Sequence, residues 1–488
     1  MDASTPPPGI TADEWAATPV VVQHMLLATC TIIAQQQQQH AELLARIADL
    51  EARLNQHSQN SSKPPSSDPP SAPPRPERVT RGRKRGGQVG HPRHERAIPT
   101  PDQITDTTDH YPTTCQQCGS DVRGNQHDVC LVQTQYVWDL PPVEPQIVAH
   151  HYHTIMCRDC GELVTAQRPA DVPPGGFGPR LVAMIGMLHG RYRISQREVV
   201  QLLADLFQFP ISLGSVVTCQ ATVSVALAPI YDAIQTQVQA APVVNIDETG
   251  WKEAGKRRWL WTVVSSAATL FLVATGRGRT VLQQLIGASY GGIVGSDRGR
   301  AYLGQPPERH QLCWAHLIRN FLALTERCGK VALWAADWLA LSDIVFRLWH
   351  MYQGGGIDRA QVQAAMEPIQ ASMHALLVTG SRRWDAGEAI SQELLEHWDA
   401  LWTFVREAGV EPTNNAAEQA LRPAVLWRKG CFGANSVEGN RFVERILSIS
   451  ATCEQQERHL LTVLTTAVDA YWRGLPAPTL RPAQTEAA

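Results

Sequence analysis

Residues 241–297 hold the pattern that most narrows the folds open to this chain. Three short runs rich in Val, Ile and aromatic residues follow one another across tight turns, which predicts three antiparallel strands. A helix-like run and one more apolar strand come next. The five runs are, in order, APVVNIDETGW, RRWLWTVVSS, ATLFLVAT, TVLQQLIGAS and GGIVGSDRGRAY. This order of elements predicts an α/β domain.

Acidic residues stand at the ends of two of these strands, Asp247 in the first and Asp297 in the last. Three antiparallel strands, a helix and another strand is the order of ribonuclease-H-like folds, in which the first and fourth strands are neighbours. We therefore expect Asp247 and Asp297 to lie side by side, although they are 50 residues apart in sequence. The run ERHQLCWAHLIRNFLALTER should pass from a short strand into a helix.

A third acid is expected from a later helix, in EPTNNAAEQALRPAVLWRKG. Glu418 falls in its first turn, Arg422 lies four residues further on the same face, and Pro423 is expected to kink or end the helix. Three residues are candidates for the N-cap: Thr413, Asn414 and Asn415. Three other acids rank below Glu418: Glu411, Glu438 and Glu444.

Three clustered carboxylates repel one another, and in a site of low dielectric constant this repulsion costs several kcal/mol. Two Mg²⁺ (or Mn²⁺) ions would relieve it, and a pair of ions ~4 Å apart suits phosphodiester chemistry. Taken singly, Asp247 also fits a turn residue at a strand end, and Glu418 fits a helix N-terminal charge that the helix dipole favours.

The stretch between the second and third acids predicts a helical insertion over about 325–410. At its start, Cys313 and His316 share a helix face; His316 could contact DNA, orient a metal ligand or be a buried histidine, and Arg319 is a further candidate DNA contact. Tryptophans at high density usually form a core, although one could stack on an unpaired base. They are Trp334, Trp338, Trp349, Trp384, Trp398 and Trp402.

Two local clusters of positive charge predict contact with nucleic acid, despite a net charge of −3. Residues 75–96 carry eight Arg or Lys against two Glu, after seven prolines between Pro64 and Pro76 that keep the chain extended. The candidates in this arm are Arg81, Arg83, Lys84 and Arg85. The second cluster, around the third acid, is Arg422, Arg428, Lys429, Arg441 and Arg445, of which the last two equally fit solvent-facing charges.

Residues 20–57 are predicted to form a helix with a zipper-like apolar seam. Leu43, Ile47, Leu50 and Leu54 are spaced four, three and four residues apart, so they fall on one face. A seam of this kind favours self-association, and packing on the helix's own domain is the alternative.

Two Cys-x-x-Cys pairs, Cys115/Cys118 and Cys157/Cys160, predict a structural zinc ribbon. The β-like runs QYVWDL and QIVAHHYHTIM lie between them, and a site of four thiolates leaves no open coordination position. Cys130 and the histidines His150, His151 and His153 are alternative ligands.

Residues 180–235 read as helical, with Ser195 and Glu198 as a capping box, and the pattern invites a helix-turn-helix interpretation. The would-be recognition helix from Leu213 to Ala240 has no Lys or Arg, so packing or dimerisation is at least as good an interpretation. Four arginines nearby could touch phosphates: Arg180, Arg191, Arg193 and Arg197.

No run of about 20 apolar residues and no basic leader is apparent, so we expect no membrane segment and a cytoplasmic, nucleoid-associated protein. The expected divisions are a zipper helix at 20–57, a basic arm at 58–105, a zinc ribbon at 106–170, a helical domain at 175–240, a catalytic domain at 241–450 and a C-terminal helix and tail at 451–488.

The chain resembles transposases of the insertion-sequence-66 family nearly end to end. The motifs that carry the resemblance are NSSKPPSSD, RKRGGQVGH, the paired cysteines, DETGW, SDRGRAY, CWAHLIRNF and TNNAAEQALRPAVLWRKGCFG. QVGHPRHER departs from the family pattern after the glycine pair, which puts in doubt only the path of the basic arm.

The resemblance implies a DDE transposase of ribonuclease-H-like fold, whose acids match Asp247, Asp297 and Glu418. It also implies cleavage at terminal inverted repeats, attack of the freed 3′-hydroxyl on target DNA, and small accessory proteins of the same element. The zipper-like seam favours a homodimer or higher oligomer. The alternatives are a nuclease without joining activity and a zinc-containing DNA-binding regulator that has lost catalysis.

Overall fold

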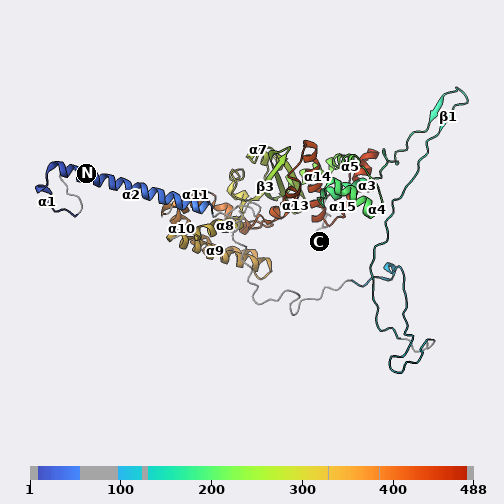
Figure 1. Cartoon of the computed structure of the whole chain (residues 1–488), viewed down its shortest axis with the longest axis horizontal. Coiled ribbons are helices and arrows are strands. Elements are labelled where there is room, and N and C mark those ends of the chain that lie inside the picture. The colour runs from blue at the N-terminus through green and yellow to red at the C-terminus, as the bar shows by residue number, and fades with distance from the viewer. Residues whose placement is uncertain (1–8, 55–96, 124–129, 328, 384, 481–488) are drawn as a thin grey trace.

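The computed structural model describes residues 9–54, 97–123, 130–327, 329–383 and 385–480. Figure 1 shows a central body from which the long helix α2 (Val20–Leu54) projects at one end. A short helix, α1 (Ala12–Ala17), precedes it. On the other side, the extended segment that contains the turn η2 (Pro101–Gln103) and the hairpin of β1 (Thr154–Met156) and β2 (Leu163–Thr165) reaches outward.

A mixed five-stranded sheet lies at the centre of the body, as the α/β prediction requires. Its strands are β3 (Val243–Glu253), β4 (Lys256–Val264), β5 (Thr269–Ala274), β6 (Ile293–Ser296) and β7 (His310–Leu312), in the spatial order β5-β4-β3-β6-β7. Strands β3, β4 and β5 are antiparallel, whereas β6 and β7 run parallel to β3. Helix α7 (Arg279–Ile286) makes the crossover to β6.

The first and fourth strands of this sheet are therefore neighbours, as the sequence predicts. In their pairing, Val243 faces Ile293 and Asn245 faces Gly295. A Cβ at Gly295 would lie 2.4 Å from Asn245 Oδ1, so a larger residue there would displace the Asn245 side chain. Strand β3 continues to Glu253, so Asp247 lies within it and not at its end as the sequence predicts, and the pairing sets this part of β3 beside the end of β6.

Helices α3 (Pro179–Gly190), α4 (Gln196–Phe207), α5 (Leu213–Ala226) and α6 (Ala228–Ala240) pack with the sheet into one core. Ser195 and Glu198 form the predicted capping box at α4. The single helix expected from Leu213 to Ala240 is wrong: it breaks after Ala226, because Pro229 begins the next helix and has no N–H to continue the previous one. Buried apolar residues of α5 face the core, which supports packing over DNA reading.

The insertion after α8 (Trp314–Thr325) is helical, as predicted: α9 (Lys330–Gln353), α10 (Arg359–Arg383), α11 (Asp385–Glu396), η5 (Trp398–Leu401) and α12 (Thr403–Arg406). It builds a second core on aromatic rings. Trp314 stacks on Trp338, and Trp338 on Phe321, with ring centroids 6.3 and 4.5 Å apart. Of the six tryptophans considered for base stacking, four are buried in this core (Trp334, Trp338, Trp349 and Trp402), Trp398 packs against it, and Trp384 lies outside the described residues.

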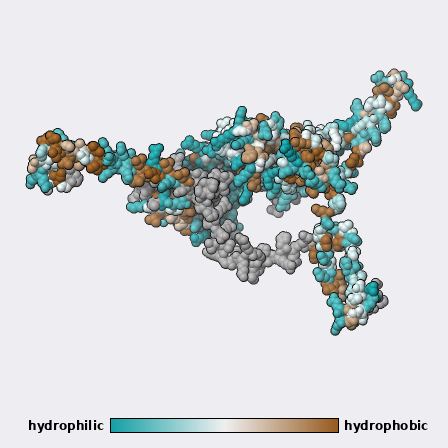
Figure 2. Space-filling view, in the orientation of Figure 1, coloured by the Kyte–Doolittle hydropathy of each residue, from teal (hydrophilic) through white to brown (hydrophobic). Residues whose placement is uncertain are grey.

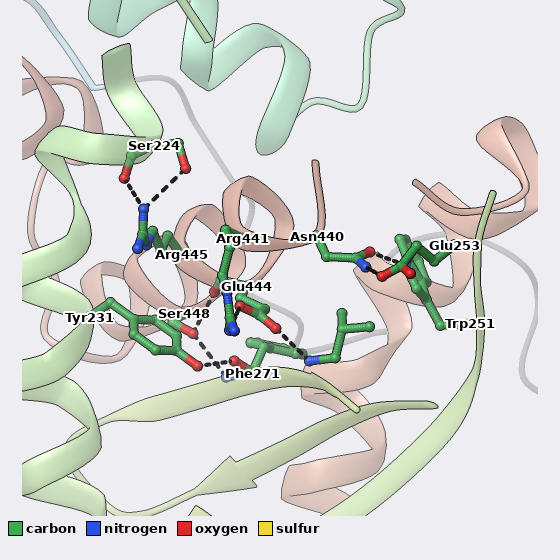
Figure 3. A network of polar contacts seen from close by, with 11 residues as sticks. Ser224, Tyr231, Trp251, Glu253, Phe271, Asn440, Arg441, Glu444, Arg445 and Ser448 are labelled. Carbon is green, nitrogen blue, oxygen red and sulfur yellow. Dashed lines mark hydrogen bonds and ion pairs between the residues drawn. The ribbon is translucent and has the colours of Figure 1, made fainter. Parts of the chain in front are cut away.

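Helix α14 (Val437–Gln455) covers the free edge of β5 with side chains spaced one turn apart (Figure 3). Glu444 Oε1 accepts the N–H of Val273, and Ser448 Oγ accepts that of Phe271, each at 2.8 Å. One turn further along α14, Thr452 Oγ1 accepts the N–H of Thr269 at 3.1 Å. Four helical residues advance about 6 Å and two strand residues about 6.6 Å, so the two spacings match. We call these three side-chain to backbone hydrogen bonds the ladder from α14 to β5. Glu444 belongs to this ladder, which is a structural reason for its ranking below Glu418.

The C-terminal helices close the body. After α13 (Asn415–Cys431) and α14, helix α15 (Leu460–Arg473) packs on α3. The runs around QYVWDL form no strand in the described part of residues 130–153, because their apolar residues are exposed and find no partner strand. Among described helices, no single one is long and apolar enough to cross a membrane, and one bent pair, α5 with α6, passes by length and composition.

Candidate functional site

Asp247 lies within β3, opposite Thr262 of β4, and its Oδ1 accepts the N–H of Glu248 at 2.9 Å. Burial raises the pKa of Asp247 well above its usual range. The negative charges of Glu248, Asp297 and Glu418 raise the pKa further, so all three acids act on this carboxyl group. Asp297 and Glu418 therefore lie near enough to Asp247 to disfavour its charged form.

Asp297 follows the last residue of β6 directly, which is the placement the sequence predicts. Its Oδ1 accepts the N–H of Gly299 at 2.7 Å, and a Cβ at Gly299 would stand 2.9 Å from that oxygen. The tight turn after β6 thus fixes the orientation of the Asp297 carboxylate.

Glu418 occupies the first turn of α13, and the N-cap is Asn414. The Asn414 side chain does not cap the helix; its Nδ2 donates to the carbonyl of Ile246 at 2.8 Å. The backbone N–H of Asn414 donates to Cys313 Sγ at 3.1 Å, and Cys313 N–H donates to Ser296 O at 2.9 Å. The buried Asn414 therefore joins the start of α13 to Ile246, the residue before Asp247. Cys313 joins Asn414 to Ser296, the residue before Asp297.

Glu418 faces two cationic or polar side chains of α8. Its Oε1 lies 3.3 Å from Arg319 Nη2 and 3.5 Å from His316 Nδ1. Burial and the charge of Arg319 lower the pKa of His316. Cys313, His316 and Glu418 offer ligand atoms within 4.8 Å of one another. The expected partner Arg422 is exposed instead. Of the two outcomes predicted for Pro423, a kink or the end of the helix, the end is wrong, because α13 continues through Pro423 to Cys431.

Glu248 is an acid of this site that the sequence interpretation missed. It is adjacent to Asp247 and accepts a hydrogen bond from the hydroxyl of the buried Tyr302. Burial raises the pKa of Glu248 to about 7. The sequence signal that could have identified it is its place as the second acid of the DETGW run, directly after Asp247.

The second positive cluster divides into two groups. Arg428 donates to Thr249 Oγ1 at 3.0 Å and to the carbonyl of Gly250, so it sits on β3, and Lys429 is exposed next to it. Arg441 pairs with Glu444 at 2.8 Å, and Arg445 donates to the carbonyl of Ser224 at 2.8 Å (Figure 3). The last two thus hold the fold together.

The paired cysteines form two turns of the same geometry. In each turn the first cysteine donates its N–H to a carbonyl five residues on and accepts, through its own carbonyl, the N–H of a glycine. Gly119 and Gly161 both have a positive φ, +75° and +74°. A hydrogen bond with Ser120 lowers the pKa of Cys118 to about 7, and backbone hydrogen bonds lower that of Cys157. Each turn on its own therefore suits a pair of zinc-binding thiolates.

The structure differs from the predicted zinc ribbon in that the two turns do not meet. Cys157 and Cys160 interact within their own turn, and in the described residues no three of the four cysteine sulfurs lie within 4.8 Å of one another. Cys118 and Cys160 are exposed, whereas Cys115 and Cys157 are half-buried. The physical reason is that the apolar residues between the turns are exposed, so no core draws the turns together.

The alternative zinc ligands are exposed: Cys130, His150, His151 and His153. The four candidate residues of the basic arm lie outside the described residues: Arg81, Arg83, Lys84 and Arg85.

Comparison with known proteins places this site in a family. A family model described as "Transposase IS66 family" matches residues 174–441, and a family of unknown function, DUF6444, matches residues 19–97. The uncharacterized protein y4hP of Sinorhizobium fredii (strain NBRC 101917 / NGR234) is 26% identical over 384 residues, which cover 70% of this chain and 67% of that protein. The uncharacterized protein y4qI of the same strain is 26% identical over 282 residues, 51% of this chain and 52% of that protein. Since the first match spans the sheet, all three acids and more than half of the chain, the chain belongs to the transposase IS66 family.

Proposed function

We propose that this chain is a DDE transposase that binds the terminal inverted repeats of an insertion sequence and catalyses metal-dependent cleavage and transfer of DNA strands. The observation that carries the proposal is that Asp297, which follows β6, and Glu418 of α13 both raise the pKa of the buried Asp247 carboxyl group on the neighbouring strand β3. The strand order β5-β4-β3-β6-β7 is that of a ribonuclease-H-like fold, which supports the same assignment.

The acid cluster fits divalent cations by its donor chemistry. Asp247 and Asp297 each use Oδ1 to accept one backbone N–H, and no other described residue hydrogen-bonds to their second oxygens. Hard carboxylate oxygens are the ligands that Mg²⁺ and Mn²⁺ prefer. Asp247, Asp297 and Glu418 would hold the ions, which polarise phosphoryl oxygens and activate an attacking hydroxyl group.

The chain's own residues would orient this chemistry. Arg319 keeps the Glu418 carboxylate in place through its 3.3 Å contact, and Asn414 fixes the helix that carries it. The hydrogen bond from the Tyr302 hydroxyl to Glu248 would fix the side chain next to Asp247. The exposed cations of α13 and the basic arm would hold the DNA backbone, which fixes position without reading sequence.

Self-association through α2 is the next part of the proposal. The seam residues of α2 are exposed (Leu43, Ile47, Leu50 and Leu54), and Figure 2 shows hydrophobic residues along the projecting helix. An uncovered seam of this length is what a second copy of the chain would bury.

Structural zinc completes the proposal. The turn of Cys115 and Cys118 and the turn of Cys157 and Cys160 would close on one Zn²⁺ ion, and the metal would supply the link that this segment's apolar residues do not. Binding of this kind releases free energy that folds a small module around the ion, so the two turns need not meet beforehand.

The test separates binding from cleavage. Asp297→Ala and Glu418→Gln should abolish Mg²⁺-dependent cleavage of DNA that carries the element's ends, while each still binds it. Glu411→Gln is the matched control, because Glu411 is exposed on the loop before α13 and should leave cleavage intact. Substantial cleavage by either acid variant would refute the assignment. Transfer of the new 3′-hydroxyl to a second duplex distinguishes a transposase from a nuclease.

A further inference from the structure

A hollow of about 540 Å³ opens beside the far end of β3, beyond the acid site. Trp251 lies four residues after Asp247 on that strand, which at about 3.3 Å per residue is ~13 Å away. Two aromatic residues line the hollow, Trp251 and Phe432, with four cations around them: Lys252, Arg257, Arg428 and Lys429. No residue of this hollow belongs to the acid cluster.

Phe432 is held over the hollow in an uncommon backbone conformation. It is 72% exposed, and as the residue that ends α13 it has a φ of +62°, which is unfavourable for a bulky side chain. The next residue has to be glycine, because a Cβ at Gly433 would stand 2.2 Å from the carbonyl oxygen of Lys252. Ala434 N–H donates to that same carbonyl at 3.0 Å. An exposed aromatic ring kept in a strained position indicates a binding role.

The opposite aromatic residue is fixed as well. Trp251 is buried, and its Nε1–H donates to Asn440 Oδ1 at 3.0 Å (Figure 3). Asn440 in turn donates to Glu253, so the indole ring at the base of the hollow has one orientation. The hollow therefore has a rigid floor at Trp251 and an exposed aromatic ring, Phe432, at its rim, an arrangement that suits a flat ligand.

The charge around the hollow is positive and largely unpaired. Glu253, the acid next to Lys252, is already paired with Arg258 at 2.9 Å. Within the described residues, neither Lys252 nor Lys429 has an ion pair. Arg257 lies over the Trp259 ring, 4.7 Å from its centroid, which leaves its charge available. The ligand that fits is therefore anionic as well as flat.

We infer that this hollow binds one unpaired nucleotide of the DNA strand that runs to the acid site, an inference that rests on the proposed function. The base stacks on Phe432 and the phosphates contact Lys252 and Lys429. An intact duplex does not satisfy the site, because its bases are already stacked inside the helix. Taking one base out of the stack costs a few kcal/mol, which aromatic stacking and phosphate contacts offset.

The experiment compares single-stranded and duplex DNA on the full chain. The probe is a 12-nucleotide oligo-dT with one central 2-aminopurine, and its blunt duplex serves as the reference. Phe432→Ala should weaken single-strand binding at least about fivefold and abolish the change in 2-aminopurine fluorescence on binding. Duplex affinity should stay within about twofold of the unmodified chain, because phosphate contacts remain.

Two controls keep the result interpretable. Tyr471→Ala removes another exposed aromatic residue, on α15, and should change neither affinity. Phe432→Trp should retain the fluorescence change, because it keeps an aromatic face. Equal loss of single-strand and duplex affinity in Phe432→Ala, or no loss of either, overturns the inference.

The outcome is independent of the cleavage test. Glu411→Gln, which lies outside both the acid cluster and the hollow, should bind the oligonucleotide like the unmodified chain. A nucleotide signal that depends on Phe432 without any cleavage would refute the proposed function and leave the hollow as a single-strand site. Cleavage that ignores Phe432 would refute the hollow and leave the transposase assignment standing.

Discussion

The ladder from α14 to β5 makes Ser448→Ala a sharp test of how the sheet edge is stabilised. Ser448 is fully buried, its Oγ accepts the N–H of Phe271 at 2.8 Å, and its hydroxyl donates to the carbonyl of Glu444 at 2.6 Å. Alanine removes the acceptor and leaves the Phe271 N–H buried without a partner. An unsatisfied buried donor costs about 1–3 kcal/mol, so the free energy of unfolding should fall by about 2 kcal/mol.

The chain offers a matched control two residues along the same helix. Ser450 is also buried, and its Oγ has no hydrogen-bond partner among the described residues. Ser450→Ala should therefore change the free energy of unfolding by less than about 0.5 kcal/mol. Both variants are measured by urea denaturation followed by circular dichroism. If Ser448→Ala costs no more than Ser450→Ala, the ladder does not stabilise the edge.

Two further predictions concern protons and metal. Burial lowers the pKa of His310 to about 3, so below pH ~6.5 the unfolded chain binds a proton there that the folded chain does not. His310 alone should therefore lower the free energy of unfolding by about 2 kcal/mol between pH 7 and 5. In urea titrations at the two pH values, the change for the unmodified chain minus the change for His310→Gln should equal this amount, because Glu248 and the other titrating groups are common to both chains. The purified chain should bind one Zn²⁺ ion, and chelation should expose 106–170 to protease while 175–480 stays resistant; Cys118→Ser and Cys160→Ser, one from each turn, should both lower the zinc content measured by atomic absorption, and undiminished zinc in either would rule out a site shared by the two pairs.

The strands of the central sheet and their order could be predicted from the sequence more fully than the bounds of the surrounding helices. The alternation around Asp247 and Asp297 is local, and the strand order follows from connection rules, so both could be predicted. The break after Ala226 depends on one proline inside an apolar run, and the pattern of apolar residues continues across it. The role of Glu444 could not be predicted, because its hydrogen bond with the N–H of Val273 depends on where β5 lies in the fold.

The acid site shows the same division. Glu418 could be placed in a first helical turn from its sequence neighbours, but its contacts with His316 and Arg319 come from a helix about 100 residues earlier. Such long-range pairs leave no periodic signal in one sequence. Glu248 was missed because its partner Tyr302 is 54 residues away and only the fold brings them together.

The hydrogen bond from Asn414 to Ile246 also bears on the order in which the acid site forms during synthesis. The two residues are 168 positions apart, and a ribosome releases the chain from its N-terminus. All five strands of the central sheet and both earlier acids therefore emerge before the helix that delivers Glu418. A chain that ends before α13 holds the whole central sheet with Asp247 and Asp297 but lacks Glu418, so under the proposed function it would not complete the acid cluster.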